Sequence, residues 1–170
     1  MKNSYALLTG FVIMITFLLA GSCNRGGSSK GEEAEKGLEV ENGGAVNIEI
    51  STVTRNGEKL IQMEDTVNVA IGTEITYLIT DVKPGKKVTW KVKSSDGIEI
   101  LEIIPVDTGG IIFKEYPTGT SNKFTLDIPD IPDSQIPEEG IQEKYLIKFL
   151  LEGDTIAYDP YLRIPPPPRP

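Results

Sequence analysis

Histidine is missing from this chain of 170 residues, and its absence removes more chemistry than any residue present suggests. Without an imidazole there is no Ser-His-Asp or Cys-His arrangement, no histidine ligand for zinc, and no side chain whose unperturbed pKa lies near neutrality. Most hydrolytic and transition-metal mechanisms are thereby excluded. A paired-carboxylate glycosidase and a Ser-Lys hydrolase need no histidine, so both remain open.

Positive charge is also scarce. Lys and Arg number 17 against 25 Asp and Glu, so the formal net charge is −8 and the sequence pI is about 4.7. No segment of the chain concentrates the basic residues. Because nucleic-acid phosphates require a basic footprint on the protein, this balance predicts that nucleic acid is not a partner.

Cysteine occurs once, at Cys23, and its surroundings indicate attachment rather than catalysis. Lys2 precedes an uncharged, mostly apolar run over residues 5–20. This order is typical of a secretory signal peptide, and the run is short for a membrane-spanning helix. The small residues Gly21 and Ser22 then lead directly to the cysteine.

The stretch FLLAGSC, residues 17–23, resembles the lipobox of bacterial lipoproteins, in which a signal peptidase cuts before a cysteine that carries diacylglycerol on its sulfur. Ala20 and Ser22 stand where Leu and a smaller Gly or Ala are most usual. The resemblance implies that residues 1–22 are a signal peptide and that Cys23 is the lipid attachment site. Palmitate-type acyl chains would then bind the protein to the outer membrane, on its periplasmic or its outer face. An incidental cysteine behind an ordinary signal peptide is the alternative.

Residues 23–45 contain mainly Gly, Ser, Glu and Lys, with Leu38 and Val40 as their large apolar residues. Such a segment cannot bury enough surface to offset its chain entropy, so we expect a flexible linker. The composition then predicts a folded domain over residues 46–164 and a proline-rich tail over residues 165–170.

From residue 46 the apolar pattern changes to a period of two, which is typical of strands with one buried and one solvated face. The alternating residues expected to face the core are Val46, Ile48 and Ile50, then Val67, Val69 and Ile71, then Val88, Trp90 and Val92. Further strands are expected at 73–80, 98–104, 110–116, 123–128, 144–152 and 155–164, with turns at Asn56-Gly57, Pro84-Gly85, Asp96-Gly97, Gly109-Gly110 and Gly153-Asp154. About seven to nine short strands at this spacing predict a single all-β, antiparallel sandwich.

Two segments resemble parts of immunoglobulin-like domains. Residues 69–97 have the order found in PKD and related bacterial Ig-like domains, where a strand, a Gly turn, a second strand and a strand with a central Trp precede Asp-Gly. Residues 138–149 place Tyr145 near the start of a long strand, which is similar to a tyrosine corner. The resemblance implies an immunoglobulin-like sandwich with Trp90 facing its core. It implies no particular function, because this fold carries many.

The acidic, proline-spaced run LDIPDIPDSQIPEE offers Asp127, Asp130 and Asp133 as candidate calcium ligands. Clustered oxygen ligands suit Ca²⁺, but the run lacks the alternating Asp, Asn and Gly that curl a loop around the ion. We therefore favour an ordered polar connection between sheets over a metal site, and expect no cofactor.

Aromatic residues make up 7% of the chain, which is thin for a sugar-binding platform. Tyr116, Tyr158 and Tyr161 are the candidates for a carbohydrate or partner surface, although tyrosines in strands more often pack half-buried. No carboxylate pair stands out for a glycosidase, and the Lys-Ser-Ser sequence at 93–95 has no catalytic motif around it. We expect that the protein is not an enzyme.

Four consecutive prolines, Pro165 to Pro168, follow the last predicted strand and force an extended polyproline II rod. We favour a role in ending the last strand and shielding its edge over docking on a partner.

The sequence thus predicts a lipid-anchored cell-envelope protein whose sandwich is a binding or structural module. Contact with a protein partner in an envelope or secretion assembly is the favoured interpretation, and capture of a surface glycan or substrate is the alternative.

Overall fold

The structure is a computed structural model that describes residues 44–93 and 97–168. All of them belong to one compact unit, Glu39–Pro170. The predicted signal peptide, Cys23 and nearly all of the linker lie outside the described residues, as do Ser94 and Ser95.

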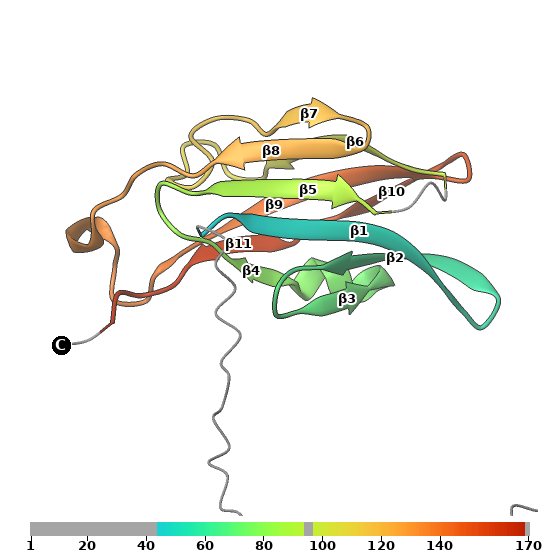
Figure 1. Cartoon of the computed structure of the whole chain (residues 1–170), viewed down its shortest axis with the longest axis horizontal. Helices are drawn as coiled ribbons and strands as arrows, with labels where there is room; N and C mark the ends of the chain where they lie inside the picture. Colours follow the sequence, from blue (N-terminus) through green and yellow to red (C-terminus); the bar gives the residue numbers. More distant parts are fainter. Residues whose placement is uncertain (1–43, 94–96, 169–170) are drawn as a thin grey trace, which may run out of the picture. The chain divides into compact units, whose positions relative to one another are not determined.

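The described residues form two β-sheets packed face to face, which confirms the predicted all-β sandwich (Figure 1). The first sheet contains, in order, β3 (Val69–Ile71), β2 (Glu58–Glu64), β1 (Val46–Arg55), β5 (Lys87–Val92), β8 (Lys123–Asp127) and β7 (Thr118–Thr120). The second contains β10 (Asp154–Tyr158), β9 (Ile141–Leu151), β11 (Tyr161–Ile164) and β4 (Ile79–Asp81), with β6 (Ile98–Pro105) paired to β9. Two short 3₁₀ helices, η1 (Gly72–Tyr77) and η2 (Asp133–Gln135), lie in connections.

The described residues hold eleven strands, more than the sequence predicts. Two of the pairings are parallel, β1 with β5 and β11 with β4, so both sheets are mixed and the prediction of an antiparallel sandwich is wrong at these two pairs. One extra strand arises because residues 155–164 divide into β10 and β11 at Pro160, which has no amide donor for a continuous ladder. Another is β2, which follows β1 through Asn56 and Gly57. Both turn residues have positive φ, 53° and 83°, the geometry of a tight hairpin.

The core consists of the inward residues of the long strands. Ile48, Ile50, Val88 and Trp90 of the first sheet are fully buried, as their alternation predicts. Trp90 lies edge to face against Tyr145 of β9, with ring centroids 5.5 Å apart, and its Nε1–H donates a hydrogen bond of 3.1 Å to the Tyr145 hydroxyl. Tyr145 therefore bonds an indole from the facing sheet, and burial raises the pKa of its hydroxyl far above the usual value.

Two segments predicted as strands have other structures. Residues 73–80 form most of η1 and then enter β4. The Glu74 carboxylate accepts the backbone N–H of Ile71 at 3.3 Å, so the chain turns at this point instead of extending. This turn carries the chain from the first sheet to the second.

Residues 110–116 form an irregular loop rather than a strand. Their amide groups are bonded by one side chain: the Glu143 carboxylate accepts the backbone N–H groups of Ile111, Ile112 (2.9 Å) and Phe113 (3.1 Å). Gly110 makes this approach possible, since a Cβ there would collide with the carboxylate. Because Glu143 accepts their hydrogen bonds, these amide groups need no partner strand.

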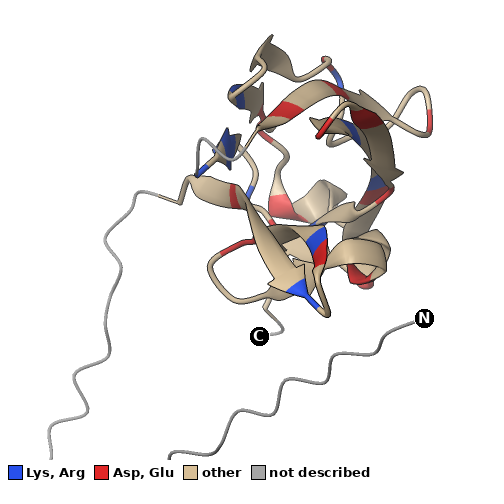
Figure 2. Ribbon diagram, turned by 90° about the vertical axis from the view of Figure 1, so that its right-hand side faces the viewer, with Lys and Arg blue, Asp and Glu red and all other residues tan. Residues whose placement is uncertain are grey.

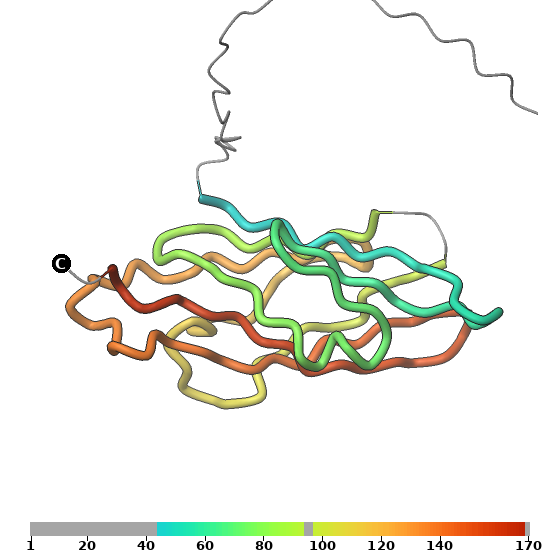
Figure 3. Tube along the Cα trace, turned by 90° about the horizontal axis from the view of Figure 1, so that it is seen from below, coloured from blue at the N-terminus to red at the C-terminus, as the bar shows by residue number. Residues whose placement is uncertain are grey.

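The proline-rich tail follows β11 but does not shield an edge of it, because β11 lies between β9 and β4. Pro165–Pro168 instead line a hollow of about 500 Å³ together with residues 82–84, 86, 130–133 and 136. The tail runs beside the loop that contains η2 (Figure 3). Gly140 packs so tightly here that a Cβ would come within 2.5 Å of the Ile164 carbonyl oxygen.

Candidate functional site: a groove between two sheet edges

A groove of about 480 Å³ opens where β3 ends the first sheet and β4 ends the second. The helix η1 connects these two edge strands, so both edges are open on the same side of the sandwich (Figures 1 and 3). The volume falls within the range of about 300 to 1,000 Å³ found for ligand pockets. We take this groove, called the β3–β4 groove below, as the candidate site.

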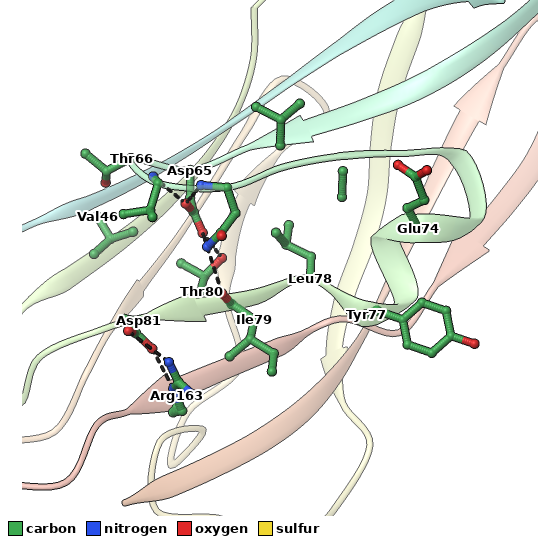
Figure 4. A pocket seen from close by; sticks show the side chains of 14 residues that line it. Val46, Asp65, Thr66, Glu74, Tyr77, Leu78, Ile79, Thr80, Asp81 and Arg163 are labelled. Carbon is green, nitrogen blue, oxygen red and sulfur yellow. Dashed lines mark hydrogen bonds and ion pairs between the residues drawn. The ribbon is translucent and has the colours of Figure 1, made fainter.

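The groove has a buried floor and an exposed apolar rim. Ala70, Leu78 and Thr80 line it and are at least 95% buried. Val67, Val69 and Tyr77 stand at its rim and are 87%, 56% and 80% exposed. Figure 4 shows the Tyr77 ring pointing away from the protein at the end of η1.

The sequence predicts that Val67 and Val69 face the core. Their exposure shows that this prediction is wrong. In the pairing of β2 with β3, Met63 lies opposite Ala70. Residues opposite each other in an antiparallel pair point to the same face, and Met63 is buried. Ala70 is therefore turned inward, and Val69 is turned out to solvent.

Asp65 organises the turn before β3 and ties it to β4 (Figure 4). Its Oδ1 accepts the backbone N–H groups of Val67 (2.8 Å) and Asn68 (2.7 Å), and its Oδ2 accepts the hydroxyl of Thr80 (2.7 Å). The Asn68 side-chain amide donates to the Ile79 carbonyl at 3.2 Å. These bonds hold the two edges at a fixed separation, so the groove is pre-formed.

Acidic residues outnumber basic ones around the groove. Asp65, Glu74 and Asp81 line it, and among the described residues the one cation in its lining is Arg163, whose guanidinium pairs with Asp81 at 2.7 and 3.1 Å. This ion pair raises the pKa of Arg163 above its usual value. Figure 4 shows Glu74 near Tyr77 and the Asp81–Arg163 pair toward the other end.

A second hollow of about 350 Å³ continues the acidic surface, since it shares Asp65 and Asp81 with the groove. It adds Glu49 and Glu64 and one cation, Lys83. The two hollows together are lined by five carboxylates and two cations. Elsewhere Lys and Arg are scattered around the sandwich rather than gathered on one part of it (Figure 2).

The three tyrosines singled out in the sequence do not form one platform. Tyr116 is 61% exposed in the loop after β6. Tyr158 packs on Phe149, with centroids 6.3 Å apart, and burial raises its pKa. Tyr161 lies beneath Lys144, whose Nζ is 5.0 Å from the ring centroid. No ring contact within residues 44–93 and 97–168 joins two of these three tyrosines.

The three calcium candidates have different surroundings. Asp127 ends β8 and pairs with Lys87 at 3.3 Å, Asp130 lines the hollow beside the tail, and Asp133 begins η2. In the part of the chain that the structure describes, no cluster of three or more acidic or Cys residues is arranged to hold a metal ion.

Cys23, the predicted lipid attachment site, lies outside the described residues. Over those residues, no helix reaches the length and apolar character needed to cross a membrane. Neither a scan of protein-family models nor a search of curated proteins returns a match to this chain.

Proposed function

We propose that this protein is a lipid-anchored binding module of the cell envelope, and that it holds a protein partner in the β3–β4 groove. The observation that carries the proposal is the exposure of Val67, Val69 and Tyr77 around a pre-formed groove. Apolar side chains grouped at a hollow mark contact surfaces, because burying them against a partner removes their contact with water.

A protein partner fits this rim better than a sugar. Two of the three exposed rim side chains are aliphatic, and their burial favours apolar groups of a partner chain. The other candidate tyrosines, Tyr116, Tyr158 and Tyr161, have separate surroundings and offer no shared stacking surface. We assign the groove a binding role with no catalytic step.

The proposed anchor is supported by the sequence around Cys23, where an apolar run and two small residues precede the cysteine. Acyl chains on this sulfur would hold the domain at the outer membrane, since two or three chains anchor a protein stably. Growth of cells with an alkyne-tagged palmitate should label the wild type and not a Cys23→Ala variant. An unlabelled wild type with a free Cys23 thiol would remove the anchor from the proposal.

The binding role is tested by photo-crosslinking in intact cells that produce the full chain. A photo-reactive amino acid at Tyr77 or Val67 should give a discrete protein adduct, identified by mass spectrometry. The same amino acid at Thr120 is the matched control, because this exposed residue ends β7, at the opposite edge of the first sheet (Figure 1). Equal background labelling from all three positions would contradict a partner in the groove.

A further inference from the structure

We infer that the occupant of the β3–β4 groove is an extended, basic segment of another protein, which adds a strand to the open edge of β3. This inference rests on the proposed function and specifies the chemistry of the partner.

The backbone of β3 offers hydrogen-bonding groups on its open side. The Asp65 N–H donates to the Asn68 carbonyl at 3.0 Å, which makes these two residues a hydrogen-bonded pair. Bonded and non-bonded pairs alternate along an antiparallel ladder, so Met63 and Ala70 are the next bonded pair. The N–H and C=O of Val69 therefore point away from β2, toward the open edge, where an added strand would find them.

The edge of β4 is less available to a new strand. The Tyr161 N–H donates to the Leu78 carbonyl, and the Val82 N–H donates to the Arg163 carbonyl, so the backbone groups of Ile79 point to the open side. The Ile79 carbonyl already accepts the Asn68 amide at 3.2 Å. The Ile79 carbonyl is thus occupied on β4. On β3 the outward N–H of Ile71 is likewise bonded to the Glu74 carboxylate, but the strand keeps both outward groups of Val69.

The side chains around β3 match an added strand. Val67 and Val69 are exposed, and cross-strand neighbours on this outer face would cover them. The opposite face of an added strand would look toward the floor formed by Ala70 and Leu78. An occupant with alternating apolar residues could therefore bury side chains on both faces.

The charge of the groove selects among possible occupants. The groove is lined by three carboxylates and one cation, and the adjoining hollow adds two carboxylates and one cation, so together they favour a segment that carries Lys or Arg. The chain's own residues 24–43 hold five Glu against one Arg and two Lys, so they share the sign of the groove. A second copy, with a net charge of −8, is also repelled. A basic segment from a different protein is therefore the occupant that the charges favour.

The first test titrates the full chain with two synthetic ten-residue peptides, one alternating Lys and Val and one alternating Glu and Val. The basic peptide should shift the amide resonances of residues 67–71. The acidic peptide should bind at least about tenfold more weakly, because it meets the carboxylates of the groove. Equal affinities, or shifts confined to other residues, would overturn the inference.

The second test removes the outward donor of β3. Val69→Pro deletes the N–H that the added strand would use, while the bonds of Ala70 to β2 remain, and prolines are tolerated at such edge positions. The affinity for the basic peptide should fall at least about tenfold. Val69→Thr is the matched control, since it keeps the N–H and the branched shape, and its affinity should stay within about threefold.

A third variant protects the test against misfolding of the proline variant. Glu64 lies opposite Val69 in the pairing of β2 with β3, so Glu64→Gln removes one charge from the adjoining acidic hollow, across β3 from the added strand, without altering the backbone. It should weaken the basic peptide several-fold, by about threefold or more, and leave the acidic peptide no weaker. Unchanged binding in both Val69→Pro and Glu64→Gln would overturn the inference.

The outcomes separate the inference from the proposed function. A protein adduct from Tyr77 that persists in Val69→Pro would leave a binding role and overturn strand addition. A dimer that forms in sedimentation experiments and is lost in Val69→Pro would show that the occupant is a second copy, which overturns the basic partner. Absence of any adduct from Tyr77 or Val67 would contradict the proposed function itself.

Discussion

The indole N–H of Trp90 donates a hydrogen bond of 3.1 Å to the hydroxyl of Tyr145, and both side chains are completely buried. Trp90 belongs to β5 of the first sheet and Tyr145 to β9 of the second. This polar bond joins the two layers within the core, in addition to the bond from the buried Thr80 hydroxyl to Asp65 beside the groove. Because each partner satisfies the other where water is excluded, loss of either group should be costly.

Tyr145→Phe removes the acceptor and leaves the buried indole N–H without its partner. We expect the free energy of unfolding to fall by about 1 to 3 kcal/mol, measured by urea denaturation. Tyr158→Phe is the matched control, since Tyr158 is only partly buried and should change stability by less than about 0.5 kcal/mol. Equal losses in the two variants would contradict a special role for the Trp90–Tyr145 bond.

The same tyrosine should make stability depend on alkaline pH. Burial raises the pKa of Tyr145 in the folded state, so the folded protein keeps its proton where the unfolded chain has lost it. The stability that this group contributes is fully present at pH values below its unfolded-state pKa of about 10, and it declines as the pH rises above that value. Urea midpoints measured between about pH 9 and pH 11 should fall more steeply for the wild type than for Tyr145→Phe. Parallel profiles would count against the buried hydroxyl as the cause.

Glu143 should control the order of the loop after β6. Its carboxylate accepts three consecutive backbone N–H groups, those of residues 111–113. Glu143→Ala should therefore speed hydrogen exchange at these amides and lower the free energy of unfolding by about 1 to 3 kcal/mol. Glu102→Ala is the control, because Glu102 forms only a surface ion pair with Lys148, worth at most about 1 kcal/mol. Unchanged exchange at residues 111–113 would disprove the role given to Glu143.

The sequence predicts most of the long strands because they carry a strong local pattern, although it misses β2. In β5, Val88 and Trp90 alternate with polar residues and are buried as expected. The pattern fails at residues 110–116, whose apolar composition indicates a strand. Their amides bond Glu143, about thirty positions away in the chain, and no local pattern reports such a partner.

The groove could be predicted only in part. Asp65 and Asn68 flank a turn, and the spacing of these two polar residues is typical of one. Alternation in β3 indicates two faces but does not say which is buried, and the pairing of Met63 with Ala70 decides it. A small residue, Ala70, takes the core position, so the sequence favours the wrong face. The exposed valines that mark the candidate site are therefore visible only in the structure.

The register of β3 can be tested without any ligand. Val67→Thr combined with Val69→Thr should leave the free energy of unfolding within about 1 kcal/mol of the wild type, because both side chains are exposed and threonine keeps their shape. Ala70→Thr is the matched change within the same strand. It should lower stability by about 1 to 3 kcal/mol, since Ala70 is 95% buried and a larger polar side chain must enter the core.

The opposite ranking would arise if the apolar alternation of the sequence decided the buried face. Val67 and Val69 would then lie in the core, and the double threonine variant would lose roughly 1 to 3 kcal/mol for each buried hydroxyl, while Ala70→Thr would be nearly neutral. Urea denaturation of the two variants beside the wild type distinguishes the cases. A stable double variant that also loses the Tyr77 adduct in cells would assign these valines to binding rather than to folding.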